Sequence, residues 1–142
     1  MTVLGFDHVA LPTIDAERLA RFYQSLGFVA TGIDEWRAGK SLIFALACGD
    51  NKINVHPETL FTRRGEEWWL RADTAVPGCG DMCFVWGDTV EALQQLLARE
   101  GIPIIDGPVE RVGGRGQGTA TGTSIYVRDP DQNLVEFITY RD

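Results

Sequence analysis

The chain has 142 residues, of which 44% are hydrophobic and 23% charged, the usual balance of a soluble globular domain with its own core. Its net charge of −7 argues against nucleic acids and anionic membranes as partners, because both require a basic surface. No apolar stretch is long enough to cross a bilayer, no signal peptide is apparent and three irregularly spaced cysteines make a poor disulfide framework, so we expect a cytoplasmic protein.

The first half of the chain predicts a strand, a helix and three further strands. Residues 5–11 alternate and are rich in apolar side chains, which is typical of a strand, and Pro12 ends it. Asp15 is a predicted helix N-cap, and Gly27 has the position of a C-cap glycine. Between them, apolar residues recur at helical spacing at Leu19, Phe22, Tyr23 and Leu26. The next strands are predicted over residues 28–33, 40–48 and 53–56.

The second half predicts the same order of elements. A short strand is predicted over residues 81–85, and Asp88 is the N-cap candidate for the helix that follows. That helix carries an apolar stripe at Val90, Leu93, Leu96 and Leu97, and Gly101 ends it. Further strands are predicted over residues 102–105, 124–127 and 134–139, with a turn at 129–133 before the last.

The spacing of matching residues indicates an internal repeat. His8 and Asp81 are 73 residues apart, as are the two predicted N-caps, whereas His56 and Glu136 are 80 apart, with the extra length in a glycine-rich loop. One four-stranded sheet with one helix leaves an apolar face that needs a partner. We therefore predict a single domain over residues 1–142, built from two modules in a pseudo-twofold arrangement, about 4–57 and about 80–141.

Two segments lie outside the repeat. Residues 57–80 join the halves. Residues 107–122 contain six glycines and predict a mobile loop, either a lid over a site or a solvated hairpin tip.

Four segments together resemble the vicinal oxygen chelate superfamily of glyoxalases, bleomycin-resistance proteins, fosfomycin-modifying enzymes and extradiol dioxygenases. They read DHVAL at 7–11, RFYQSLGF at 21–28, INVHP at 53–57 and YVRDPDQNLVEF at 126–137. The last segment is the most specific, and the resemblance covers nearly the whole chain. It extends to the small glyoxalase-domain proteins labelled virulence proteins. It implies an α+β fold in which two βαβββ modules form a cupped half-barrel around a metal ion.

The resemblance places metal ligands on the first and last strands of each module. On this chain it selects His8 and His56 in the first module, and Asp81 and Glu136 in the second. Imidazole and carboxylate groups suit zinc, nickel, manganese or iron. We therefore predict a divalent metal ion with His8, His56 and Glu136 as its ligands. The alternative for His8 is a core histidine, and the alternative for His56 is a surface histidine. The alternative for Glu136 is a solvated strand residue.

Three neighbouring residues leave the chemistry open. Asp81 stands where many family members have His, so it is a fourth ligand, a general base or a turn residue. Asn54 shares a strand face with His56 and is a candidate contact to the metal's ligands or to the substrate. Cys83 shares the face of Asp81, and we expect a buried, inert thiol there.

Further side chains are candidates for a substrate pocket. The junction carries four that either line a pocket or pack as plugs: Arg63, Arg64, Trp68 and Trp69. Arg111 and Arg115, in the glycine-rich segment, are candidates to clamp an anionic substrate.

The resemblance implies a metal-dependent enzyme that acts on a small substrate with neighbouring oxygens, through glyoxalase-like lyase or isomerase chemistry. The alternatives are an iron-dependent extradiol-type dioxygenase and a non-enzymatic, drug-binding resistance protein, which needs no metal. The residue at Asp81 disfavours a thiol transferase acting on fosfomycin. Family members of this size are commonly homodimers, so we expect a homodimer, with modules paired either within a chain or across two chains.

Overall fold

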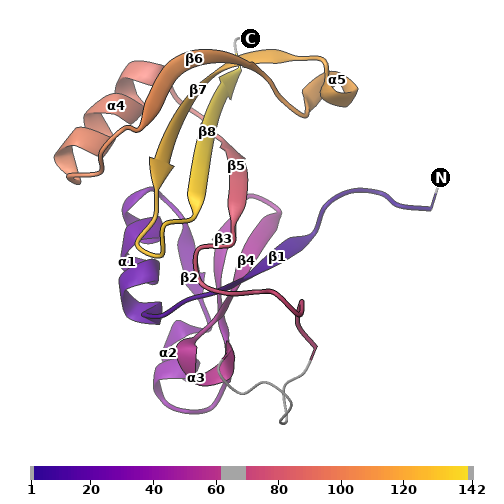
Figure 1. The fold of residues 1–142 in the computed structure, drawn as a ribbon, viewed down its shortest axis with the longest axis vertical. Coiled ribbons are helices and arrows are strands. Elements are labelled where there is room, and N and C mark those ends of the chain that lie inside the picture. Colours follow the sequence, from indigo (N-terminus) through magenta and orange to yellow (C-terminus); the bar gives the residue numbers. More distant parts are fainter. Residues whose placement is uncertain (1, 62–69, 141–142) are drawn as a thin grey trace. The chain divides into compact units, whose positions relative to one another are not determined.

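The computed structural model describes residues 2–61 and 70–140, which form two compact units, Met1–Cys79 and Gly80–Asp142 (Figure 1). Each unit has one four-stranded sheet and repeats the predicted order of strand, helix, strand, strand and strand. The predicted α+β fold of two βαβββ modules is therefore confirmed. We refer to the units as the first and second module and describe each by itself. Among the described helices, none has the length and apolar character needed to cross a membrane.

The sheet of the first module has the strand order β1-β4-β3-β2. Its strands are β1 (His8–Pro12), β2 (Val29–Thr31), β3 (Phe44–Cys48) and β4 (Asn51–His56), and its helices are α1 (Ala16–Ser25), α2 (Ile33–Arg37) and α3 (Glu58–Phe61). β1 is parallel to β4, and the other neighbouring strands are antiparallel. Because β1 and β2 form opposite edges of the sheet, the segment that contains α1 links one edge to the other.

The helix α1 forms where the sequence predicts it. The Asp15 side chain accepts a hydrogen bond of 3.0 Å from the Arg18 backbone N–H, so the predicted N-cap is confirmed. Gly27 follows the helix with a φ of +99°, a left-handed conformation that favours glycine. The apolar stripe of α1 and one face of the sheet supply the buried core, which includes Leu11, Leu19, Ala20, Tyr23, Leu46, Ile53 and Val55.

Alternation along the strands divides the sheet into a core face and a second face, which we call the open face. Its positions on the three neighbouring strands β1, β4 and β3 are His8, Ala10, Lys52, Asn54, His56, Ala45 and Ala47. Small residues occupy much of this face.

The helix α2 was not predicted, because residues 28–33 were assigned to one strand. Gly32 ends β2 early, since its φ of +74° turns the chain into α2. Arg37 then fixes α2 to α1 through two bonds of 2.8 Å from its guanidinium to the Glu17 carboxylate. That ion pair holds the pKa of Glu17 below its usual value.

The sheet of the second module has the corresponding order β5-β8-β7-β6, with β5 parallel to β8. Its elements are β5 (Asp81–Val85), α4 (Val90–Arg99), β6 (Asp106–Val112), α5 (Arg115–Gly118), β7 (Thr121–Arg128) and β8 (Leu134–Tyr140). Its buried core includes Leu93, Leu97, Ile125, Val127, Val135 and Phe137. The opposite, open face carries Asp81, Cys83, Glu136, Tyr126 and Arg128.

Two predictions for this module were wrong in detail. The N-cap of α4 is Thr89, whose side chain accepts a 3.1 Å hydrogen bond from the Ala92 backbone N–H, while Asp88 accepts from the Thr89 backbone. The strand predicted at residues 102–105 begins later, as β6. Much of the glycine-rich segment 107–122, predicted as a mobile loop, therefore belongs to β6, α5 and the start of β7.

A buried hydrogen-bonded group of Asp129, Asn133 and Gly80, which we call the clasp, fixes the position of the chain where this module begins. The Asp129 carboxylate accepts hydrogen bonds from the Asn133 backbone N–H at 3.0 Å and from its side-chain amide at 2.7 Å. The Asn133 side-chain oxygen in turn accepts from the Gly80 backbone N–H at 2.7 Å, and the Leu134 N–H donates to the Gly80 carbonyl. Asp129 and Asn133 are buried, so their mutual bonds satisfy groups that water does not reach. The clasp joins the residue before β5 to the start of β8.

Candidate functional site

A row of four side chains crosses the open face of the second module. Cys83 on β5 is the register partner of Glu136 on β8, Glu136 of Tyr126 on β7, and Tyr126 of Asp106 on β6. Register partners point to the same face of a sheet and lie next to each other. The strands therefore bring a thiol, a phenol and two carboxylates together along one line.

Glu136 lies at the centre of this row, with Cys83 and Tyr126 as its register partners on the two neighbouring strands. Burial raises the pKa of the Cys83 thiol to about 12, and its hydrogen bond to the Glu136 carboxylate adds to the effect. The hydrogen bond to Glu136 is the main reason why the pKa of Tyr126 is also raised. Both groups therefore stay protonated at neutral pH and stand beside the Glu136 carboxylate as neutral neighbours.

Arg111 on β6 extends the row on its far side. Its Nε donates to the Tyr126 hydroxyl oxygen at 3.1 Å, and its guanidinium carbon lies 5.7 Å from the centre of the Tyr126 ring. Its Nη1 donates to the Glu110 carbonyl at 3.0 Å, and its Nη2 lies 3.7 Å from the Asp106 carboxylate. Tyr126 thus stands between a cationic guanidinium, to which its hydroxyl is hydrogen-bonded, and its register partner Glu136.

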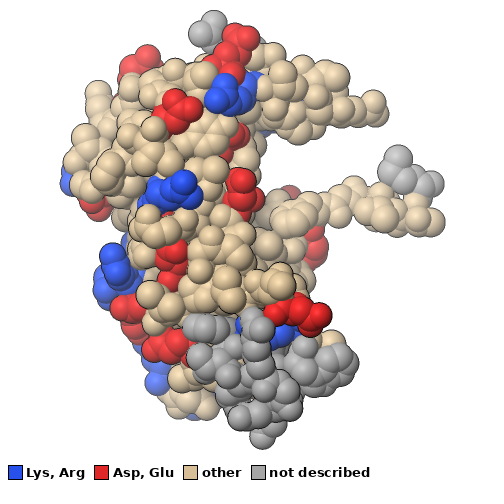
Figure 2. Space-filling model, in the orientation of Figure 1, with Lys and Arg blue, Asp and Glu red and all other residues tan. Residues whose placement is uncertain are grey.

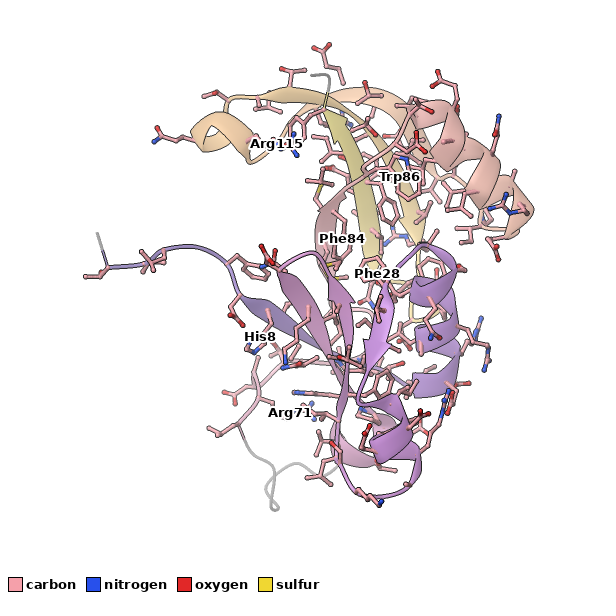
Figure 3. The ribbon with its side chains drawn as sticks, turned by 180° about the vertical axis from the view of Figure 1, so that it is seen from behind. His8, Phe28, Arg71, Phe84, Trp86 and Arg115 are labelled. Carbon is pink, nitrogen blue, oxygen red and sulfur yellow. The ribbon has the colours of Figure 1, made fainter. Side chains whose placement is uncertain are left out.

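In the first module, His8 lies on β1 at the edge of the sheet (Figure 3). Its side chain is 46% exposed, and its Nδ1 lies 2.5 Å from the Asp7 carboxylate. A carboxylate at Nδ1 fixes the imidazole tautomer and leaves Nε2 available as a ligand. Asn54 lies on the same face, on the neighbouring strand β4, with Ala10 and Ala45 as its register partners.

The two sheets reveal which residues correspond in the repeat. His8 begins β1 as Asp81 begins β5, so these two positions correspond, as predicted. Glu136 pairs with the third residue of β5, and in the first module the third residue of β1 pairs with Asn54. The residue that corresponds to Glu136 is therefore Asn54. The spacing that matched His56 with Glu136 was wrong by two positions.

His56 occupies a different environment from His8. The register places His56 opposite Pro12 and His8 opposite Lys52, so the two histidines are four positions apart, roughly 13 Å along the strands. His56 is buried, and burial is the main reason why its pKa is lowered, with a further contribution from the nearby Arg71 guanidinium. His56 is therefore a neutral imidazole at physiological pH, next to a positive charge.

The remaining predicted residues divide into two groups. Arg115 is the first residue of α5, and its guanidinium carbon lies 4.4 Å from the centre of the Tyr140 ring, so it packs on an aromatic ring (Figure 3). The four junction candidates, Arg63, Arg64, Trp68 and Trp69, lie outside the described residues.

Acidic and basic side chains are interspersed over the face seen in Figure 2.

Comparison with known proteins adds the family. The family model of the Glyoxalase/Bleomycin resistance protein/Dioxygenase superfamily matches residues 5–137. The chain belongs to this superfamily. The resemblance carried by the four sequence segments is therefore confirmed.

Two relatives in the superfamily match along nearly the whole chain. The chain is 34% identical over 142 residues to glyoxalase domain-containing protein RDO1 of Mycosarcoma maydis, covering 100% of this chain and 72% of that protein. It is 36% identical over 141 residues to virulence protein STM3117 of Salmonella typhimurium, covering 99% of this chain and 87% of that protein. The crystal structure of the STM3117 protein matches with a TM-score of 0.82 at 33% identity, over 99% of this chain and 100% of that chain.

Two more distant structures share the fold alone. Lactoylglutathione lyase from Agrobacterium tumefaciens matches with a TM-score of 0.66 at 19% identity, over 95% of this chain and 92% of that chain. The antibiotic-binding protein TnmS3 from Streptomyces matches with a TM-score of 0.67 at 18% identity, over 99% of each chain. The superfamily fold thus occurs in a lyase and in a binding protein, so the function of this chain has to be argued from its own residues.

The described strands carry donor types that suit a divalent metal ion, a histidine in the first module and carboxylates in the second. His8 offers a nitrogen whose tautomer Asp7 fixes, and Glu136 offers a carboxylate that two protonated groups orient. Asn54 and Asp81 offer oxygens at the corresponding positions of the repeat. Across residues 2–61 and 70–140, no three His, Cys, Asp or Glu side chains are grouped closely enough to hold an ion.

Proposed function

We propose that the chain is a metal-dependent enzyme acting on a small substrate with two neighbouring oxygens, by glyoxalase-like lyase or isomerase chemistry. We propose His8, His56 and Glu136 as ligands of a divalent ion, which is zinc, nickel, manganese or iron. The observation that carries the proposal is the repeated placement of donor groups. The first strand of each module begins with one, at His8 and Asp81, and the last strand holds another, at Asn54 and Glu136.

The chemistry follows from the charges at these positions. A bound divalent ion would polarise the substrate oxygens and stabilise negative charge that develops on them. The protein's part is to hold its ligands in place before the ion arrives. Asp7 sets the tautomer of His8, and Cys83 and Tyr126 flank Glu136 on the neighbouring strands.

Metal titration of single variants tests the ligand set. Chelator-treated wild type should bind one Mn²⁺ per chain, and His8→Ala and Glu136→Gln should weaken the affinity about 10- to 100-fold or more, as measured by calorimetry. Glu110→Gln, which removes an exposed carboxylate from β6, two strands from Glu136 in the same sheet, is the matched control and should leave the affinity unchanged. A wild type that binds no Mn²⁺, Zn²⁺, Ni²⁺ or Fe²⁺ would contradict the proposal.

The place of His56 is tested in the same titration. The proposal expects His56→Gln to lose affinity like His8→Ala. The four-position separation in register and the adjacent Arg71 charge both oppose a shared ion within one module. Wild-type affinity in His56→Gln would remove His56 from the ligand set.

The reaction class is tested with substrates. Metal-loaded protein should convert an α-hydroxy or α-keto carbonyl compound without taking up oxygen, and Glu136→Gln should not. Ring opening of a catechol with oxygen uptake would indicate a dioxygenase instead. Tight binding of a drug by metal-free protein, without turnover, would indicate a resistance protein.

We further propose that the protein is a cytoplasmic homodimer. The proposal rests on membership of the superfamily, whose members of this size are commonly dimers, and on the composition of the chain.

A further inference from the structure

An irregularity in β6 changes the direction of every side chain that follows it. Asp106 pairs with Tyr126, but Val109 pairs with Ser124, so β6 contains one residue more than the strand opposite it. Such a β-bulge reverses the alternation of faces, because side chains repeat every two residues. Arg111 therefore pairs with Gly122, on the face of Tyr126. Without the extra residue Arg111 would lie opposite Thr121, on the other face.

The bulge depends on a glycine. Gly107 has a φ of +93°, and a Cβ there would lie 2.3 Å from the Ser124 carbonyl oxygen. Any other residue would meet backbone that cannot move aside, besides the left-handed conformation. Bulges that re-aim a side chain are frequent next to active sites. Here the re-aimed side chain is Arg111.

The surroundings of Arg111 hold it in place but leave part of it free. Its Nε and Nη1 are engaged by the Tyr126 hydroxyl and the Glu110 carbonyl. Its Nη2 is 3.7 Å from Asp106, beyond hydrogen-bond distance, and the side chain is 42% exposed. Among the described residues, no acceptor lies within hydrogen-bond distance of Nη2, so its N–H groups are available to a ligand. Because its other nitrogens are already held, the Arg111 side chain loses little conformational entropy when an anion binds at Nη2.

We propose that Arg111 is an anion-binding, specificity-determining residue that selects substrates bearing a carboxylate. The proposal deepens the proposed function and rests on it, because Arg111 is hydrogen-bonded to Tyr126, the register partner of Glu136, which is one of the proposed metal ligands. Tyr126 stands between the two groups, because its hydroxyl accepts from Arg111 Nε at 3.1 Å and its Cα is the register partner of Glu136. A small substrate whose neighbouring oxygens lie at Glu136 reaches Arg111 with a carboxylate a few bonds away.

Two hydroxamates form a matched pair of probes. Acetohydroxamate presents two neighbouring oxygens, and succinic monohydroxamate adds a carboxylate to the same chelating group. Mn²⁺-loaded wild type should bind the carboxylate-bearing probe at least tenfold more tightly, by calorimetry, since charge-assisted hydrogen bonds to an arginine are strong. Arg111→Gln should lose that preference, keep the wild-type affinity for acetohydroxamate and Mn²⁺, and melt within a few degrees of wild type.

Controls separate recognition from a structural role. Arg99→Gln, at the exposed end of α4, changes the net charge equally and should retain the preference. Arg111→Lys should recover part of it, because it keeps the charge without the guanidinium geometry. Equal weakening of both probes, or loss of Mn²⁺ affinity, in Arg111→Gln would show that Arg111 only positions Tyr126 and would overturn the proposal.

A metal-free arm distinguishes this proposal from the proposed function. Succinate should bind chelator-treated wild type weakly, in competition with chloride, and should bind Arg111→Gln at least tenfold more weakly. That result stands even if no metal binds, in which case the proposed function fails and the anion site remains. Equal succinate affinity in wild type and Arg111→Gln overturns the anion site.

Discussion

At the scale of single residues, the second module shows how a neighbour sets the reactivity of a thiol. The sequence predicts a buried, inert Cys83 because it shows no activating neighbour, and the burial was wrong, since the residue is exposed on the edge strand β5. In the structure Cys83 has a neighbour, Glu136, whose negative charge disfavours the thiolate that desolvation already disfavours. The raised pKa, for which desolvation is the largest cause and the Glu136 carboxylate the next, keeps the thiol protonated and therefore inert.

Alkylation rates test this environment. Cys79 and Cys83 are both exposed, but at pH 8 a thiol with a pKa of about 12 is about one part in ten thousand thiolate, so iodoacetamide should modify Cys83 far more slowly than Cys79. Glu136→Gln removes the negative charge and should speed the reaction at Cys83, as followed by peptide mass spectrometry. Equal rates at Cys79 and Cys83 in wild type would contradict the assigned hydrogen bond.

The sequence identifies the donor residues more reliably than it identifies which residues of the two modules correspond. His8 and Glu136 are visible as polar residues in apolar strands, and the repeat spacing aligns His8 with Asp81. The correspondence of Asn54 with Glu136 was missed because the distance along the sequence includes loops, whose lengths differ between the two modules. The pairing of strands does not depend on those loop lengths. The signal was present in the flanking residues, since Ile53-Asn54-Val55 and Val135-Glu136-Phe137 share the same apolar, polar, apolar pattern.

At the scale of elements, the regular segments were predicted well and the glycine-rich one was not. β5, α4 and β8 coincide closely with their predicted ranges, because hydrophobic periodicity specifies buried faces. β6 is an edge strand with exposed side chains, so its sequence shows little alternation. Its bulge also interrupts the period. Glycines that signal a loop in one setting allow close strand contact in this one.

The start of α4 provides a matched pair of substitutions. Thr89→Ala removes the side-chain acceptor of the Ala92 N–H and should lower the free energy of unfolding by about 1 kcal/mol. Asp88→Ala, the residue favoured by sequence alone, leaves that bond intact and should cost less than half as much. Urea denaturation of both variants measures the difference. A larger loss in Asp88→Ala would restore Asp88 as the N-cap.

At the scale of the whole molecule, the two modules share a topology but differ in chemistry. The row of the first module that corresponds to Cys83, Glu136, Tyr126 and Asp106 contains Ala10, Asn54, Ala45 and Thr31. Three of these four are small, and none is ionisable. The repeat has therefore kept its strand register while the ionisable groups of this row are confined to one copy.

The proposed homodimer is tested by mass in solution. Sedimentation equilibrium at micromolar concentration should give about 31 kDa, twice the chain mass of 15.7 kDa. The comparison should be made with and without Mn²⁺, since a ligand that binds the assembled form stabilises it. A mass near that of one chain under both conditions would contradict the dimer.

The clasp at Gly80 has a consequence for how such proteins diversify. Because Asp129 and Asn133 fix Gly80 from within the second module, the register between β5 and β8 is established after the junction ends. The junction can therefore change in length or sequence over evolution without moving Glu136 relative to Cys83. The same hydrogen bonds make an insertion directly before β5 disruptive. A residue added between Gly80 and Asp81 would shift β5 by one place, and a different side chain would then stand beside Glu136.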